Sequence, residues 1–310
     1  MLSNPTTKSA LDRRLRSLDR GLDADLSRDA EALHRARVAS RRLREALPLL
    51  AMCDPWPEAD REAFEAAGKT IRGLTRALGG VRELDVALAI VDEFSAGRPN
   101  LRAGLAAVRG AIADERERRL RGLRARVDVR RLRKTSRVLA GIAAREEGSP
   151  AVALDQRIRR HARALNAAVQ QAGLVYAAET LHRIRIAAKK LRYALELVEE
   201  VEHRPARGLV RSLEQVQDLL GRMHDLEVVA AFARALRTDR RRPAGVRRAL
   251  ADVLDALDGE IRDRHADYVA RHEALLALTA DATALAALPA RKRRSRRPSA
   301  RKPGDVSDAA

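Results

Sequence analysis

The chain has 310 residues, of which 34% are charged and only 2% are aromatic, and its formal net charge is +19 at pH 7. This length can bury a substantial core, and the composition, rich in Leu, Ala, Arg, Glu and Asp, predicts an all-α protein. The single cysteine, Cys53, excludes an intramolecular disulfide and a cysteine-based metal site. The excess of positive charge indicates an anionic partner.

The N-terminal sequence has no apolar run of the length that a signal peptide needs. No segment approaches the roughly 18 to 20 apolar residues that span a bilayer. We therefore expect a cytoplasmic protein with no membrane partner.

Apolar residues recur at helical spacing along most of the chain, and glycines, prolines and short polar runs divide it. Pro48 is expected to kink a helix because it lacks an N–H. Gly21 and the pair Gly79-Gly80 are expected to bend or interrupt helices, and Gly173 to end one. The expected helices are 9–28, 29–52, 58–78, 81–94, 101–126, 128–144, 151–172, 175–202, 207–220, 222–236 and 246–288, the last as one helix or two.

Two pairs of similar segments indicate an internal duplication. LHRARVASRRLREAL (33–47) and LHRIRIAAKKLRYAL (181–195) align without gaps, and LGGVRELDV (78–86) and LGRMHDLEV (220–228) follow them in the same order. We therefore expect two homologous helical halves that pack about a pseudo-twofold axis, which would bring the repeated segments to related places. The expected organisation is an N-terminal arm (1–8), one domain (9–288) made of two halves (9–145 and 151–288) joined by a linker (146–150), and a disordered basic tail (289–310).

The repeated helices each carry a stripe of cations beside an apolar stripe when residues are placed about 100° apart. Such a ladder is about 15 Å long at 1.5 Å rise per residue. Guanidinium groups match pairs of phosphate oxygens, and lysine supplies a point charge. The ladders, which we predict to be the main phosphate contacts, are His34, Arg37, Arg41, Arg44 and His182, Arg185, Lys189, Arg192.

Eight further residues are secondary candidates. Four of them lie on the repeated helices, where helical phase turns them away from the ladders. The other four are candidates for additional walls of the anion-binding site. They are Arg35, Arg42, Arg183, Lys190, Arg72, Arg76, Arg82 and His224.

The chain resembles the CHAD family, the conserved histidine α-helical domain, over roughly residues 9–288. The resemblance rests on the motif H-x-x-R-[VI]-x-x-[RK]-[RK]-L-R, followed by L-G-x-x-[RH]-[DE]-L-[DE]-V, in both halves. It implies two helical bundles around a basic cavity and non-enzymatic binding of inorganic polyphosphate, with no cofactor. It also implies that the protein associates with polyphosphate granules in the cytoplasm.

Like charges on one helix face repel each other, so a bound polyanion or nearby carboxylates must offset the repulsion. The histidines can donate more hydrogen bonds to phosphate when protonated. We therefore expect polyanion affinity to rise as pH falls below about 7. The carboxylates that provide the alternative explanation are Glu45, Glu83, Asp85, Glu196, Asp225 and Glu227.

Other functions remain open. His224-Asp225 is similar to the metal-binding pair of helical phosphohydrolases, but the equivalent residues in the first half, Arg82-Glu83, cannot bind a metal in that way, so we expect no metal site. Nucleic-acid binding through the basic surface and the tail is the main alternative, although aromatic stacking platforms are scarce. A scaffold that binds acidic proteins is the third possibility.

Overall fold

A computed structural model describes residues 7–22, 30–50, 57–143 and 151–288. Over these ranges the chain folds into helices and forms no strand, so the predicted all-α class is confirmed. The elements are α1 (Thr7–Leu22), α2 (Ala30–Leu50), α3 (Glu58–Gly97), the 3-10 turn η1 (Pro99–Leu101), α4 (Arg102–Arg126), α5 (Val129–Ala143), α6 (Ala151–Ala172), α7 (Ala178–Glu202), α8 (Arg207–Thr238) and α9 (Ala244–Leu285). The expected arm, the linker, the tail and Cys53 lie outside the described residues.

The expected interruptions at the repeated glycines are wrong. Helix α3 runs for 40 residues through Gly79-Gly80, and α8 runs for 32 residues through Gly221. An interior glycine costs a helix about 1 kcal/mol relative to alanine. Packing of the apolar face outweighs that cost, because Leu78 and Val81, on either side of the glycine pair, are fully buried.

Other helix signals have clear structural roles. Gly173 follows α6 with a φ of 55°, the left-handed conformation in which glycine commonly ends a helix. Asp128 caps α5, because its Oδ1 accepts a hydrogen bond from the backbone N–H of Arg131 at 3.0 Å. Gly21 lies where α1 crosses α2, and a Cβ there would come within 2.9 Å of the Ala36 Cα. Its absent side chain therefore permits a close helix crossing.

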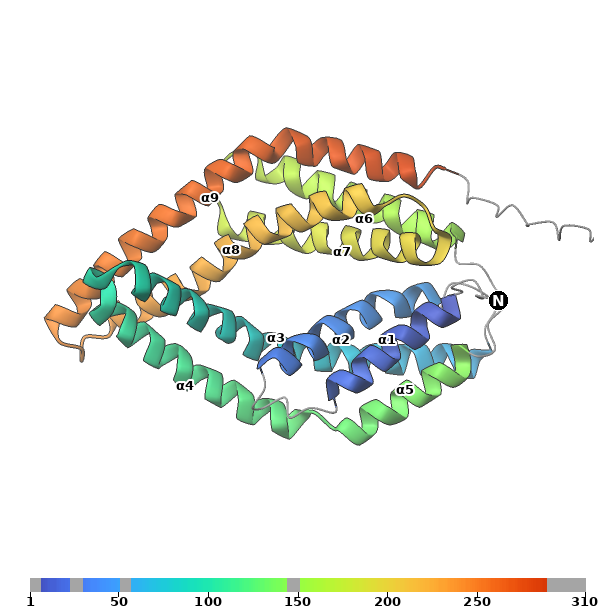
Figure 1. The fold of residues 1–310 in the computed structure, drawn as a ribbon, viewed down its shortest axis with the longest axis horizontal. Coiled ribbons are helices and arrows are strands. Elements are labelled where there is room, and N and C mark those ends of the chain that lie inside the picture. Colours follow the sequence, from blue (N-terminus) through green and yellow to red (C-terminus); the bar gives the residue numbers. More distant parts are fainter. Residues whose placement is uncertain (1–6, 23–29, 51–56, 144–150, 289–310) are drawn as a thin grey trace, which may run out of the picture.

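Three apolar cores hold the helices together. The first unites α1, α2 and α5 with the N-terminal part of α3 and the C-terminal part of α4. The second unites α6 and α7 with the N-terminal part of α8 and the C-terminal part of α9. The third joins the remaining parts of α3, α4, α8 and α9, and it includes Phe94, Leu105, Leu226 and Leu257. The first half, α1–α5, and the second half, α6–α9, thus form two helical bundles that share one apolar junction (Figure 1).

Ion pairs link the halves away from that junction. Arg13 and Arg14 on α1 contact the carboxylate of Glu200 on α7 at 2.8 Å and 2.5 Å. Arg157 on α6 contacts Glu45 on α2 at 2.9 Å. Apolar packing therefore joins the halves at one end, whereas charged contacts join them elsewhere. That the halves arose by duplication stays a prediction.

Candidate functional site

The two predicted ladders lie on α2 and α7, which are in contact between the halves. All eight ladder residues are part-buried, whereas Arg35, Arg42, Arg183 and Lys190 on the same helices are exposed. Buried leucines and alanines fix this orientation, because they hold the apolar stripe of each helix in its own bundle core. The neighbouring stripe of each helix is thereby directed toward the other half.

The electrostatics show that the ladders converge. Burial lowers the pKa of Arg37 on α2, and the next largest cause is the charge of Arg185 on α7. Burial lowers the pKa of Lys189 on α7 to about 6, followed by the charges of Arg41, Arg185, Arg37 and Arg192. Burial also lowers the pKa of Arg41 to about 10. The charged forms of these groups are therefore destabilised by loss of water and by one another.

Carboxylates neutralise one end of the ladders. Arg44 contacts Glu45 at 3.0 Å, and Arg192 contacts Glu196 at 3.5 Å and Glu214 at 3.1 Å. Glu45 and Glu196, two of the carboxylates that could replace a polyanion in offsetting the repulsion, therefore pair with ladder arginines.

The centre of the ladders is different. Within the described part of the chain, Arg37, Arg41, Arg185 and Lys189 have no ion-pair partner. The nearby Tyr193 is buried, and the Cζ atom of Arg41 lies 5.5 Å from its ring centroid. Glu83 acts on Arg37 and Asp225 acts on Arg185 through their charges, but neither forms an ion pair with a central cation among the described residues.

A hollow of about 730 Å³ lies next to these cations, between α2, α3, α7 and α8. Its walls include two residues from each ladder, together with Arg82 and His224 of the secondary candidates. Arg41 and Lys189 lie one turn beyond the ladder residues Arg37 and Arg185 that line it. The lining residues are His34, Arg37, Gly79, Gly80, Arg82, Glu83, Val86, Ala89, Ile90, Glu93, His182, Arg185, Gln217, Asp218, Gly221, Arg222, His224 and Asp225.

Three histidines line the hollow, and one of them contacts a carboxylate of the other half. The rings of His182 and His224 lie 4.9 Å apart between centroids, and His224 Nε2 lies 3.5 Å from Glu83 Oε1 on the opposite half. Burial lowers the pKa of His34 and of His182, followed by the charge of Arg82 for His34 and of His224 for His182. The buried Nδ1 atoms of His34 and His182 have no hydrogen-bond partner among the described residues. The two ladders therefore begin with imidazoles that retain unused hydrogen-bonding capacity.

The glycines of the second motif are site residues that sequence reasoning missed. A Cβ on Gly79 would lie 3.7 Å from Nε of Arg37, and a Cβ on Gly221 would lie 3.8 Å from Nε of Arg185. At these distances a Cβ would touch the guanidinium without displacing it, so each guanidinium lies against the helix backbone at a position that has space for only a small side chain. The repeated Leu-Gly at the start of both second motifs was the available signal.

His224-Asp225 does not form the core of a metal cluster in the described ranges, where no group of three or more His, Cys, Asp or Glu could hold a metal ion. His224 instead contacts Glu83 and His182. Burial raises the pKa of Asp225, although the nearby charge of Arg185 acts in the opposite direction.

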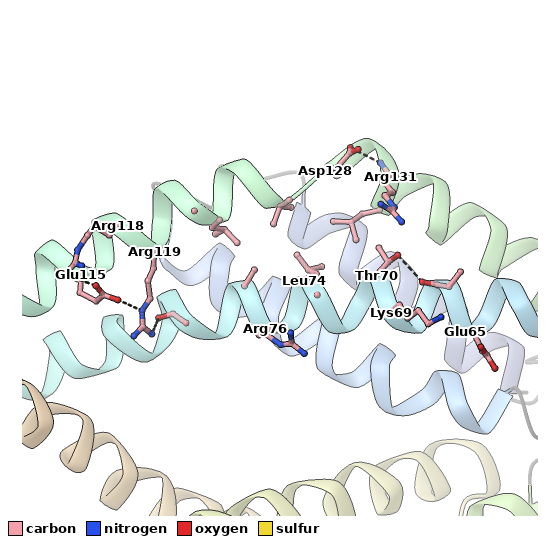
Figure 2. A pocket seen from close by; sticks show the side chains of 18 of the residues that line it. Glu65, Lys69, Thr70, Leu74, Arg76, Glu115, Arg118, Arg119, Asp128 and Arg131 are labelled. Atoms are coloured by element: carbon pink, nitrogen blue, oxygen red, sulfur yellow. Dashed lines mark hydrogen bonds and ion pairs between the residues drawn. The ribbon is translucent and has the colours of Figure 1, made fainter.

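The last two secondary candidates lie elsewhere. Arg76 lines a separate hollow of about 1140 Å³ between α3, α4 and α5 (Figure 2). Figure 2 shows Arg119 extending from α4 toward α3, and Glu115 pairs with both Arg118 and Arg119 at 2.8 Å. Arg72 is exposed and is in neither lining. Neither Arg72 nor Arg76 is therefore part of the wall of the hollow between the halves.

Fold and site together define an all-α protein of two bundles with a cation cluster between them. The CHAD domain profile matches residues 9–234, and the chain belongs to the CHAD domain family. The crystal structure of the CHAD domain from the plant Ricinus communis is similar at a TM-score of 0.59 and 25% identity, over 91% of both chains. PptA from Streptomyces chartreusis is similar in fold at a TM-score of 0.50 and 18% identity, over 90% of this chain and 97% of that one. No curated protein matches the chain.

None of the helices in the described ranges is long and apolar enough to cross a membrane.

Proposed function

We propose that this protein is a non-enzymatic module that binds inorganic polyphosphate between its two halves. Polyphosphate binding is known for the family to which the chain belongs. The observation that carries the proposal is the cluster of Arg37, Arg41, Arg185 and Lys189, which converge from two halves without an ion-pair partner among the described residues. His34, His182, Arg44 and Arg192 extend the same surface.

The energetics of the cluster favour an anionic ligand. Part-buried cations that face one another are unfavourable in the free protein, because each loses water and gains repulsion. A polyanion supplies negative charge and hydrogen-bond acceptors to several of them at once, and arginine forks match its oxygens in pairs. Binding thus relieves an unfavourable arrangement that the two-bundle fold imposes.

Two charge reversals on the same helices test the proposal. Arg41→Glu with Lys189→Glu places two carboxylates within the cluster, whereas Arg42→Glu with Lys190→Glu makes the same change on the exposed side. We expect the first pair to abolish binding of long-chain polyphosphate and the second pair to retain most of it.

Binding is measured by calorimetry with phosphate chains of graded length, and circular dichroism checks that both variants are helical. Equal losses in the two folded variants would show that bulk charge, and not the cluster, binds the ligand. Affinity that is independent of chain length would also oppose the proposal and favour a scaffold for acidic proteins.

The surface of α5 supports nucleic-acid binding as a second candidate function. Arg130, Arg131, Lys134 and Arg137 are exposed on this helix, which contains no acidic residue. Such a face can contact phosphates of a duplex without reading bases. Competition between polyphosphate and duplex DNA or RNA at fixed salt separates the two functions. Arg41→Glu with Lys189→Glu should remove only polyphosphate binding. Arg130→Glu with Lys134→Glu should remove only duplex binding.

The proposal involves binding and no chemical step. His224, which was considered for hydrolysis, contacts Glu83 and His182. A module of this kind would collect where polyphosphate accumulates, so we propose association with cytoplasmic polyphosphate granules. Fluorescence imaging of the tagged chain beside stained granules tests this location, and the cluster variant is its control.

A further inference from the structure

A hollow of about 780 Å³ lies between α8, α9 and the loop that joins α6 to α7. This α9 hollow shares no lining residue with the hollow between the halves. Its volume is in the range of about 300–1,000 Å³ that is typical of small-molecule sites. Its α9 wall begins at Asp258 and ends at Ala270, with residues three or four apart, which make one continuous face of the helix. We propose that the α9 hollow is a second ligand site, which binds small organic acids with a flat apolar body.

Aromatic residues fix the loop that closes one side of the α9 hollow. The Tyr176 hydroxyl donates a hydrogen bond to Glu227 on α8, and the Tyr176 ring meets the His265 ring on α9 edge-on, at 5.3 Å between centroids. The Tyr268 hydroxyl donates to the carbonyl oxygen of Gly173, where the loop begins, at 3.3 Å. The chain has only three tyrosines, so two of them lie at this one place. The Tyr176 and His265 rings give the hollow flat apolar surfaces, which favour a flat ligand.

The rest of the wall is apolar and has room for a ligand. On α9, Ala266 and Ala270 are exposed and have no side-chain atom beyond Cβ, so the helix face is shallow at both positions. Leu174 lines the hollow from the loop with 57% of its surface exposed, and the adjacent Val175 is 75% exposed. Large apolar side chains exposed together beside a concave surface are typical of binding sites. A ligand that covers Leu174 would remove apolar surface from water.

The charged residues of the α9 hollow favour a ligand with a single negative charge. Arg234 contacts two carboxylates, Glu227 at 3.1 Å and Asp258 at 3.4 Å. Arg262 also lines the hollow, and it forms no ion pair among the described residues. Its guanidinium can therefore donate to both oxygens of a ligand carboxylate. A long polyphosphate chain would also meet Glu227 and Asp258, which would repel it.

Three compounds with the same naphthalene ring and different charge test this assignment. They are naphthoate, which is negative, naphthalenemethanol, which is neutral, and naphthylmethylamine, which is positive. Saturation-transfer NMR with the full chain at neutral pH measures the three affinities. We expect naphthoate to bind with a Kd of about 0.1–1 mM, as is usual for a ligand of this size. Naphthalenemethanol should bind about fivefold more weakly, because it lacks a charge for Arg262, and naphthylmethylamine more weakly still.

Two substitutions with matched controls on the same helix locate the site. Ala266→Trp fills the α9 hollow and should weaken naphthoate binding about tenfold, whereas Ala280→Trp, at an exposed position of α9 outside the hollow, should leave it unchanged. Arg262→Gln should weaken naphthoate about fivefold without changing naphthalenemethanol. Arg248→Gln, also exposed on α9 and outside the hollow, should affect neither compound. Circular dichroism checks that each variant is helical.

The proposal is overturned if none of the three compounds shows saturable binding, or if naphthylmethylamine binds as well as naphthoate. Full naphthoate binding by a folded Ala266→Trp chain would also overturn it. If that variant does not fold, the comparison of Arg262→Gln with Arg248→Gln decides, and equal affinities in these two overturn it.

The cluster variant, Arg41→Glu with Lys189→Glu, separates this site from the proposed function. It should bind naphthoate as the unmodified chain does, because neither residue lines the α9 hollow. Loss of naphthoate binding in this variant would assign the carboxylate to the cation cluster and overturn the proposal. A chain that binds naphthoate but not polyphosphate would contradict the proposed function alone.

Discussion

Replacement of Lys189 by methionine should stabilise the free protein. Methionine keeps an unbranched apolar side chain but has no amine to desolvate. The pKa of Lys189 falls from 10.5 in a free lysine to about 6 in the fold. At pH 7.5 the unfolded chain carries a protonated Lys189, whereas the folded chain carries a mostly neutral one. Removing that proton three pH units below 10.5 costs about 4 kcal/mol, at 1.36 kcal/mol per unit. Because the side chain retains some solvent contact, we expect about half of this to be recovered, or about 2 kcal/mol.

The pH dependence has a definite sign. Below about pH 6 the amine is protonated in both the folded and the unfolded chain, and the cost of burying that charge is at its maximum. As pH rises from 6 toward 10.5, the Lys189 amine of the unfolded chain becomes easier to deprotonate. The free-energy cost of burying Lys189 on folding therefore decreases. At pH 9.5 one unit remains, and the stabilisation by Lys189→Met should fall to below about 1 kcal/mol.

Urea and thermal unfolding of the wild-type chain and the variant at pH 7.5 and 9.5 measure the difference. Lys190→Met, on the exposed side of α7, should change stability by less than about 0.5 kcal/mol at either pH. A Lys189→Met chain that is no more stable at pH 7.5, or whose advantage grows with pH, would refute the account of the cluster as an unfavourable arrangement. The same variant should bind polyphosphate more weakly, as expected where a binding site is maintained at the expense of stability.

Three further predictions concern the site histidines, Gly79 and the ion pairs between the halves. Burial lowers the pKa values of His34 and His182, and a bound polyanion should raise them. Polyphosphate affinity should therefore increase as pH falls through about 6.5. Replacement of both histidines by glutamine should remove this pH dependence in calorimetric titrations. Gly79→Val should displace Arg37 and weaken polyphosphate binding at least fivefold without loss of helical circular dichroism, and an unchanged affinity would rule out the proposed contact. Glu200→Gln removes the charged partner of two α1 arginines, one of them buried, and should lower the free energy of unfolding by about 1–3 kcal/mol, which urea titration would detect.

Helical periodicity predicted the fold class and the orientation of the ladders correctly. The spacing of leucine and alanine identifies the buried face of α2 and α7, and the adjacent stripe then follows from geometry alone. This is why Arg41 and Arg42, neighbours of identical chemistry, could be sorted into a part-buried and an exposed residue. Local pattern was sufficient because each helix has one strongly apolar stripe.

Local pattern was insufficient where tertiary contacts decide the outcome. Gly79 and Gly221 break a helix by propensity, yet long helices run through both because flanking leucines are buried. Which carboxylates neutralise which cations depends on helix packing between distant segments: Glu45 reaches Arg157, which lies 112 residues away in the sequence. The third apolar core, shared by both halves, was likewise not evident from the periodicity of any one helix.

The closeness of Gly79 to Arg37, and of Gly221 to Arg185, links positions that stand in different motifs. Among homologous sequences such positions should not drift independently. A lineage that acquires a residue larger than alanine at the glycine position should also carry a shorter side chain opposite it, and one that keeps the arginine should keep a small residue at the glycine position. Covariation between the two motifs would then record a steric constraint that neither motif reveals by itself.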